Sequence, residues 1–160
     1  IALHGWGDTE RAEQYCRQAV GWCDELRNDT DRASALYILA EVHRLQGKMS
    51  QAYDEAALSL GLFRQMGDRK SQAKALYRLS QLDADRGELE SARKNATLGL
   101  ALCRQLQDGW GTIYVTHLLG QVYDRLGQKA EALTLWTEAV ALAEPLAHPL
   151  LGTLRECLRV

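Results

Sequence analysis

Apolar residues recur every three or four positions along most of this chain, which is the spacing of one face of an α-helix. In one stretch the apolar face comprises Ala33, Leu36, Leu39, Ala40 and Val42. After a glycine, a second stretch continues with the same spacing through Ala52, Ala56, Leu60, Phe63 and Met66. The pattern therefore predicts two amphipathic helices joined by a short turn.

This helix pair repeats along the chain with a period of 40 residues. The shift aligns four glycines, Gly7, Gly47, Gly87 and Gly127. Five residues later it aligns four alanines, Ala12, Ala52, Ala92 and Ala132, with no insertion or deletion. Glycine tolerates the left-handed backbone that ends a helix, so we place it in the turn between the first helix of a unit, helix A, and the second, helix B. The small alanines let neighbouring helix backbones approach closely.

The period divides the chain into one continuous array over residues 1–160. Complete units span 31–70, 71–110 and 111–150. Residues 1–30 form a partial unit and residues 151–160 begin a further helix, so we expect a block of a longer protein. The residues expected to cap the incoming helix A, by accepting a hydrogen bond from its first N–H groups, are Asn28, Asp68 and Asp108.

The unit over 111–150 resembles the tetratricopeptide repeat family. The residues that carry the resemblance are Leu119, Gly120, Tyr123, Gly127, Ala132, Trp136, Ala139 and Pro145. The other units keep the glycine and the alanine but replace Tyr123 by His43 and Asp83. The resemblance implies an all-α fold, a right-handed α-solenoid of stacked antiparallel helix hairpins. The common family period is 34 residues, and a period of 40 resembles the extended-helix type found in bacterial multidomain signalling and regulatory proteins.

The composition of the chain excludes several classes of function. A formal net charge of −2 gives no basis for nucleic-acid or anionic-membrane binding. No apolar run approaches the length of about 18 residues needed to span a bilayer, so no membrane partner is expected. The four cysteines form no CxxC pair and the first residues do not read as a signal peptide, which favours a reducing, cytoplasmic location.

Candidate chemistry is sparse. Cys23 and Cys103 share a repeat position with Phe63 and Ala143, so a small core residue explains them better than a redox site. The histidines show no zinc-protease or nucleophile pattern, and no phosphate-binding loop is present. We therefore predict no enzyme activity, no metal and no cofactor. Trp136 lies at a core repeat position, whereas partial exposure is plausible for Trp110.

The resemblance also implies that helices A line an inner, concave surface that binds a protein or peptide. The positions that carry over are Ser34, Tyr37, Glu41, Arg44, Lys74, Tyr77, Gln81, Asp85, Tyr114, His117, Gln121 and Asp124. Aromatic and amide side chains there can contact an extended peptide or a partner helix. An open alternative is that the tyrosines only seal the groove between helices A.

Two functions follow from this reading. The first is a non-catalytic protein- or peptide-binding scaffold, the sensor or assembly segment of a larger bacterial regulatory protein. The alternative is a structural spacer or self-association module, because apolar faces at the ends of the solenoid could join copies of the chain.

Overall fold

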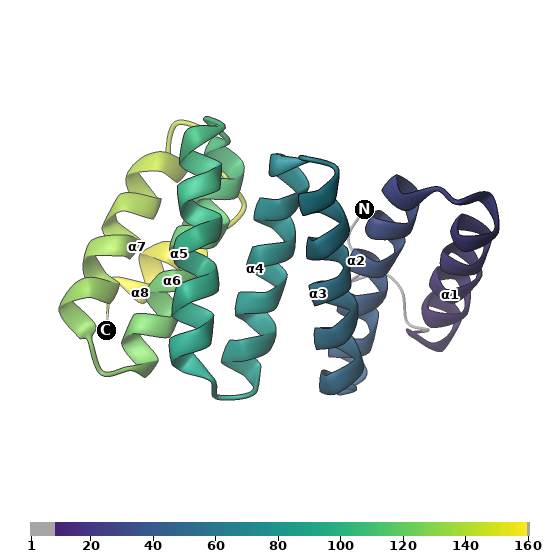
Figure 1. Cartoon of the computed structure of the whole chain (residues 1–160). Helices are drawn as coiled ribbons and strands as arrows, with labels where there is room; N and C mark the ends of the chain where they lie inside the picture. Colours follow the sequence, from purple (N-terminus) through teal and green to yellow (C-terminus); the bar gives the residue numbers. More distant parts are fainter. Residues whose placement is uncertain (1–8, 160) are drawn as a thin grey trace. The chain divides into compact units, whose positions relative to one another are not determined.

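A computed structural model describes residues 9–159, and within that range the chain is helical with no β-strand (Figure 1). Its helices are α1 (Thr9–Leu26), α2 (Asp29–Leu45), α3 (Met49–Gln65), α4 (Arg69–Asp85), α5 (Leu89–Gln105), α6 (Gly109–Arg125), α7 (Lys129–Ala143) and α8 (Leu151–Cys157). The all-α fold class and the succession of helices A and B are thereby confirmed. None of the helices within 9–159 combines the length and the apolar character needed to cross a bilayer.

The turns between helices A and B depend on the repeated glycines. Gly47, Gly87 and Gly127 have φ angles of 75°, 82° and 79°, the left-handed region that a residue with a Cβ rarely adopts. This confirms the predicted role of these three glycines. Gly7, the fourth member of the aligned set, lies outside the described residues.

The capping residues behave as the sequence predicts. The side chain of Asn28 accepts a hydrogen bond from the backbone N–H of Asp31 at 3.1 Å. Asp68 and Asp108 make the same contact three residues ahead, at 3.0 and 2.9 Å. Hydrogen bonds from Ser71 lower the pKa of the Asp68 carboxyl. Each of these helices therefore begins where a side-chain oxygen satisfies an N–H group that has no partner within the helix.

The chain divides into two compact units, and the boundary lies inside α4, between Arg78 and Leu79. Unit 1 contains α1, α2, α3 and the first part of α4. Unit 2 contains the remainder of α4 with α5, α6, α7 and α8. These two compact units are numbered 1 and 2 and are distinct from the 40-residue repeat units.

In unit 1, alanines form the contacts between helices. Ala33 of α2 and Ala52 and Ala56 of α3 are fully buried. The hydroxyl of Ser59 donates a hydrogen bond of 2.8 Å to the Ala33 carbonyl, which fixes the position of α3 along α2. Met66, which the apolar pattern places on the same stripe, instead lies at the surface. It follows α3 as its C-cap, and its Sδ accepts a hydrogen bond of 3.3 Å from the Thr30 hydroxyl of α2.

A buried polar network joins α1, α2 and α3 of unit 1. His43 of α2 is 1% exposed and lies between two carboxylates, with Nδ1 at 2.7 Å from Glu55 of α3 and Nε2 at 3.3 Å from Glu13 of α1. Glu13 also pairs with Lys48 and Arg17, each at 2.7 Å. The hydrogen bond from Lys48 is the main reason that the pKa of Glu13 falls to about 2, whereas burial raises the pKa of Glu55. The network therefore holds opposite charges where a purely apolar contact would otherwise lie.

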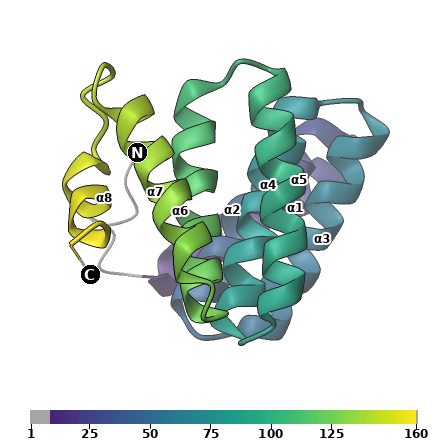
Figure 2. The ribbon, with the colours of Figure 1, turned by 90° about the vertical axis from the view of Figure 1, so that its left-hand side faces the viewer.

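In unit 2 the core forms where α8 meets α6 and α7 (Figure 2). Its members are Ile113, Ala132, Trp136, Ala139, Ala143 and Leu154. Trp136 is buried, as its repeat position predicts, and its Nε1 donates a hydrogen bond of 3.3 Å to the His117 carbonyl. A second cluster packs Ala92 of α5 against Ala84 and Val122. Small residues thus set the helix separation here as in unit 1.

Candidate protein-binding surface

The twelve predicted binding residues lie on α2, α4 and α6, the helices A of the three complete units. None of them is buried. Five are exposed: Ser34, Lys74, Asp85, Gln121 and Asp124. Seven are half-buried: Tyr37, Glu41, Arg44, Tyr77, Gln81, Tyr114 and His117. The structure therefore leaves one face of each helix A accessible, and aromatic residues form the less exposed part of that face.

In unit 1, Tyr37, Glu41 and Arg44 lie around Arg78, a residue that the sequence analysis did not select. Arg78 of α4 forms an ion pair with Glu41 of α2, and its guanidinium carbon lies 5.1 Å from the centre of the Tyr37 ring. Arg44 also binds Glu41, with Nε at 2.8 Å and a terminal nitrogen at 3.1 Å. Two arginines and one carboxylate therefore meet beside an aromatic ring, an arrangement that joins charge pairing with cation–π contact.

The sequence does contain a signal that could have identified Arg78 as an unusual residue. The 40-residue period aligns it with Ile38 and Leu118, both apolar. Leu118 is buried like Arg78, whereas Ile38 is 47% exposed. A buried cation needs a partner, and Glu41 supplies it. Arg78 is only 8% exposed, so most of its side chain is covered.

The other unit 1 positions differ in how far they are available to a partner. The hydroxyl of Ser34 donates a hydrogen bond to the Thr30 carbonyl at 3.1 Å. Lys74 is exposed and forms no ion pair within the described part of the chain. Tyr77 is half-buried. Lys74 is therefore the member of this group best placed to meet a charged partner.

In unit 2, Tyr114 belongs to an aromatic cluster around His148, which lies between α7 and α8. The His148 ring is 2% exposed and packs against Tyr114 and Trp110 with ring centres 4.8 and 4.5 Å apart. The N–H of Leu150 donates to its Nδ1 at 3.2 Å, so the neutral ring carries its proton on Nε2. Burial lowers the pKa of His148, which favours this neutral form. Trp110 is half exposed and forms the outer side of the cluster.

The remaining unit 2 positions present mixed chemistry. Burial lowers the pKa of His117, so its half-buried ring favours the neutral form. Gln121 and Asp124 are exposed on α6. This face combines a neutral imidazole, an amide and a carboxylate, which suits hydrogen bonding to a polypeptide.

Three of the cysteines lie in surroundings that disfavour the thiolate form. Cys103 is buried, and burial raises the pKa of the thiols of Cys16, Cys103 and Cys157. A reactive cysteine needs the opposite shift. Within residues 9–159, no group of three or more His, Cys, Asp or Glu side chains is arranged to hold a metal ion.

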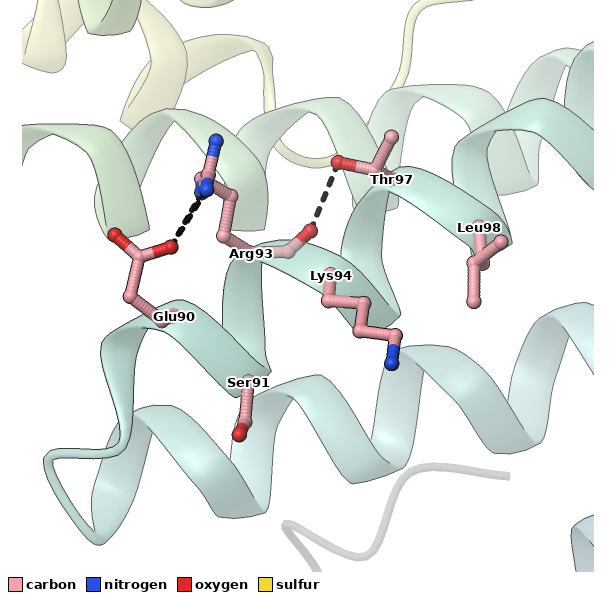
Figure 3. Close-up of a pocket in the computed structure, with 6 residues that line it drawn as sticks. All are labelled: Glu90, Ser91, Arg93, Lys94, Thr97 and Leu98. Carbon is pink, nitrogen blue, oxygen red and sulfur yellow. Dashed lines mark hydrogen bonds and ion pairs between the residues drawn. The ribbon is translucent and has the colours of Figure 1, made fainter.

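A shallow hollow lies along one face of α5 (Figure 3). The residues that line it are Glu90, Ser91, Arg93, Lys94, Thr97 and Leu98. Arg93 pairs with Glu90 at 2.6 Å and Thr97 donates to the Arg93 carbonyl at 2.8 Å, so these polar groups bind each other. All of the lining residues belong to the single helix α5.

Comparison with solved structures identifies the architecture. The chain is similar to BtubC (BKLC) from P. vanneervenii, with a TM-score of 0.86 and 20% identity over 97% of this chain and 65% of that one. It is similar to a putative kinesin light chain of Podosopora anserina with nearly identical TPR-like repeats, with a TM-score of 0.78 and 18% identity over 95% and 76% of the two chains. The apo form of RapI gives a TM-score of 0.88 and 16% identity over 95% and 56%.

The chain therefore has the fold of tetratricopeptide-like helical repeat proteins, a solenoid of helix hairpins. It spans less than two thirds of the length of BtubC and of RapI. No family model and no curated protein sequence matches it.

Proposed function

We propose that this chain is a non-catalytic scaffold that binds a protein or peptide through the exposed face of its helices A. In this proposal it acts in the cytoplasm as the sensor or assembly segment of a larger bacterial regulatory protein. The observation that carries the proposal is the division of each helix A into two faces. One face is buried against helix B, while the other presents aromatic, amide and charged side chains that the fold does not bury.

This division favours binding because the exposed residues offer what a polypeptide needs. Half-buried aromatic rings such as Tyr77 and Tyr114 provide apolar area with little loss of side-chain freedom. The neighbouring Gln81 and Gln121 can pair with backbone amides. Structural likeness to TPR-like repeat proteins supports the same type of surface.

A bulky charge placed on the exposed face of α6 should block binding. Gln121 is exposed, so Gln121→Arg should leave the fold intact and reduce capture by peptides on an array by about tenfold. Thr134→Arg is the matched control, because Thr134 is exposed on α7, a helix B. Capture should be measured for wild type and both variants. Equal losses in the two variants would contradict a site on the helix A face.

A second function, self-association, is favoured by one observation. The helix α1 exposes large apolar side chains, with Trp22 62% and Leu26 77% exposed. Apolar area of this kind commonly marks a contact surface. Light scattering over a concentration series should then show an increase in mass that Trp22→Arg suppresses. A constant monomer mass for the wild type would exclude this function for the isolated chain.

A further inference from the structure

The part of α4 that belongs to unit 1 concentrates positive charge. It carries Arg69, Lys70, Lys74 and Arg78, and no Asp or Glu occurs anywhere from position 69 to position 82. The first turn of α4 contains no acidic residue. The chain as a whole has a net charge of −2, so this segment differs in sign from its surroundings.

These charges do not help the helix. Cations four residues apart on a helix repel each other, as Lys70 and Lys74 must. Cations in the first turn also oppose the helix dipole, which favours negative charge there. Since Lys70 and Lys74 are exposed, they contribute no buried contact in compensation. Their arrangement is therefore better explained by binding than by stability.

Lys70, Lys74 and Arg78 form one line along α4, which we call the basic stripe. Residues four apart on a helix are separated by about 6 Å along its axis. Side chains at alternate positions of an extended peptide lie on one side, about 6.6 Å apart. Carboxylates at every second residue of an extended segment would therefore match the cations of the stripe. Tyr37 stands beside its Arg78 end, where the ring already contacts the guanidinium.

The chain already supplies one carboxylate to the basic stripe. Glu41 of α2 pairs with Arg78 and also receives two hydrogen bonds from Arg44. A carboxylate is thus the group that this surface binds in the structure. An incoming acidic side chain would have to compete with Glu41 for the buried Arg78. Lys74 is exposed and attracts the Asp68 carboxyl electrostatically, but it forms no ion pair with it, so it is the cation that such a side chain can reach directly.

We propose that the basic stripe binds an acidic segment of a partner protein, and that Glu41 limits the affinity by occupying Arg78. This rests on the proposed function and names the chemistry of its partner. An acidic polypeptide fits better than a nucleic acid, because Asp29, Asp31 and Glu41 on α2 belong to the same unit and would repel a long polyanion. A short segment can place its carboxylates on the stripe alone.

The test measures fluorescence anisotropy of two labelled peptides with the whole chain, one alternating Glu and Ser and the other alternating Gln and Ser. The wild type should bind the Glu peptide about tenfold more tightly, and added salt should weaken this preference. Lys74→Gln should reduce affinity for the Glu peptide by about threefold to tenfold. Lys94→Gln, which removes the same charge from the exposed face of α5, should leave it unchanged. Glu41→Gln should raise the affinity by about threefold.

Other results would overturn the proposal. Equal binding of the two peptides, equal effects of Lys74→Gln and Lys94→Gln, or no binding of the Glu peptide would each do so. Tighter binding of a single-stranded oligothymidylate than of the Glu peptide would assign the stripe to nucleic acid instead. If uncharged peptides bind on an array and Gln121→Arg blocks them, while the Glu peptide gains no preference, only the acidic partner is wrong. If peptides of every composition fail to bind, the scaffold function fails as well.

Discussion

Replacing Gly120 by alanine should lower the free energy of unfolding by about 2–3 kcal/mol, although alanine is normally the better residue inside a helix. Gly120 lies within α6, directly beneath the indole of Trp136. A Cβ at this position would lie 2.7 Å from Cδ1 and 2.9 Å from Cε2 of that ring. The tryptophan would have to move, and its hydrogen bond to the His117 carbonyl would be lost. Chemical denaturation followed by circular dichroism and tryptophan fluorescence measures the change.

Gly61→Ala is the matched control for this substitution. Gly61 also lies inside a helix, α3, and a Cβ there would meet no atom within 4 Å. The same change should therefore stabilise the chain by about 0.5–1 kcal/mol, the ordinary preference of a helix for alanine over glycine. The two substitutions should have opposite signs. If Gly120→Ala were also stabilising, the close approach of α6 to Trp136 would be incorrect.

Replacing His43 by leucine should lower the free energy of unfolding by about 3 kcal/mol. The substitution leaves the carboxylates of Glu13 and Glu55 in a site that has lost the group between them. A double substitution tests this reason directly. The 40-residue period places Tyr123 and Leu135 where unit 1 has His43 and Glu55, so His43→Tyr with Glu55→Leu transfers an apolar pair from another unit. Its cost should be smaller than the sum of the two single costs. Additive costs would mean that the pair does not interact.

The same network should give a defined dependence on pH. The pKa of Glu13 is lowered to about 2 from an ordinary value of 4.5. A lowered folded-state pKa stabilises the fold above pH 4.5, and this contribution is lost as the pH falls toward 2. The difference in unfolding free energy between wild type and Glu13→Gln should therefore be constant near neutral pH and shrink in that acidic range. A difference that does not change with pH would contradict the ionised state of Glu13.

Local rules explain what the sequence predicted correctly. The left-handed turns at Gly47 and Gly87 need a residue without a Cβ, and the caps at Asn28 and Asp108 need a short side chain with an oxygen. Such requirements recur at the same place in every unit, so an alignment of the chain with itself reveals them. The burial of Trp136 follows from the same periodicity.

The features that escaped sequence reasoning depend on contacts that differ between units. Arg78 meets Glu41 across 37 positions of the chain, and its repeat equivalents are apolar. His148 acquires its aromatic neighbours from α6, more than one helix earlier. From the sequence, the replacement of Tyr123 by His43 and Asp83 at one repeat position looks like a loss of the family pattern. The structure shows that His43 pairs with Glu55. The apolar spacing of a helix can be read from the sequence of one repeat, but the partner of an individual polar side chain cannot.

The difference between units at this last position bears on how a repetitive chain reaches the correct arrangement. Helices from different hairpins could pair wrongly, since any helix A offers an apolar stripe to any helix B. In unit 1 the matched residues are His43 and Glu55, and in unit 2 they include Asp83, which accepts a hydrogen bond of 2.8 Å from Asn95. If the helix A that carries Asp83 paired with the helix B that carries Glu55, two carboxylates whose pKa values burial already raises would face each other. Each polar pair therefore favours the pairing of a helix A with the helix B of its own hairpin, and pairing with a helix from another hairpin should be disfavoured.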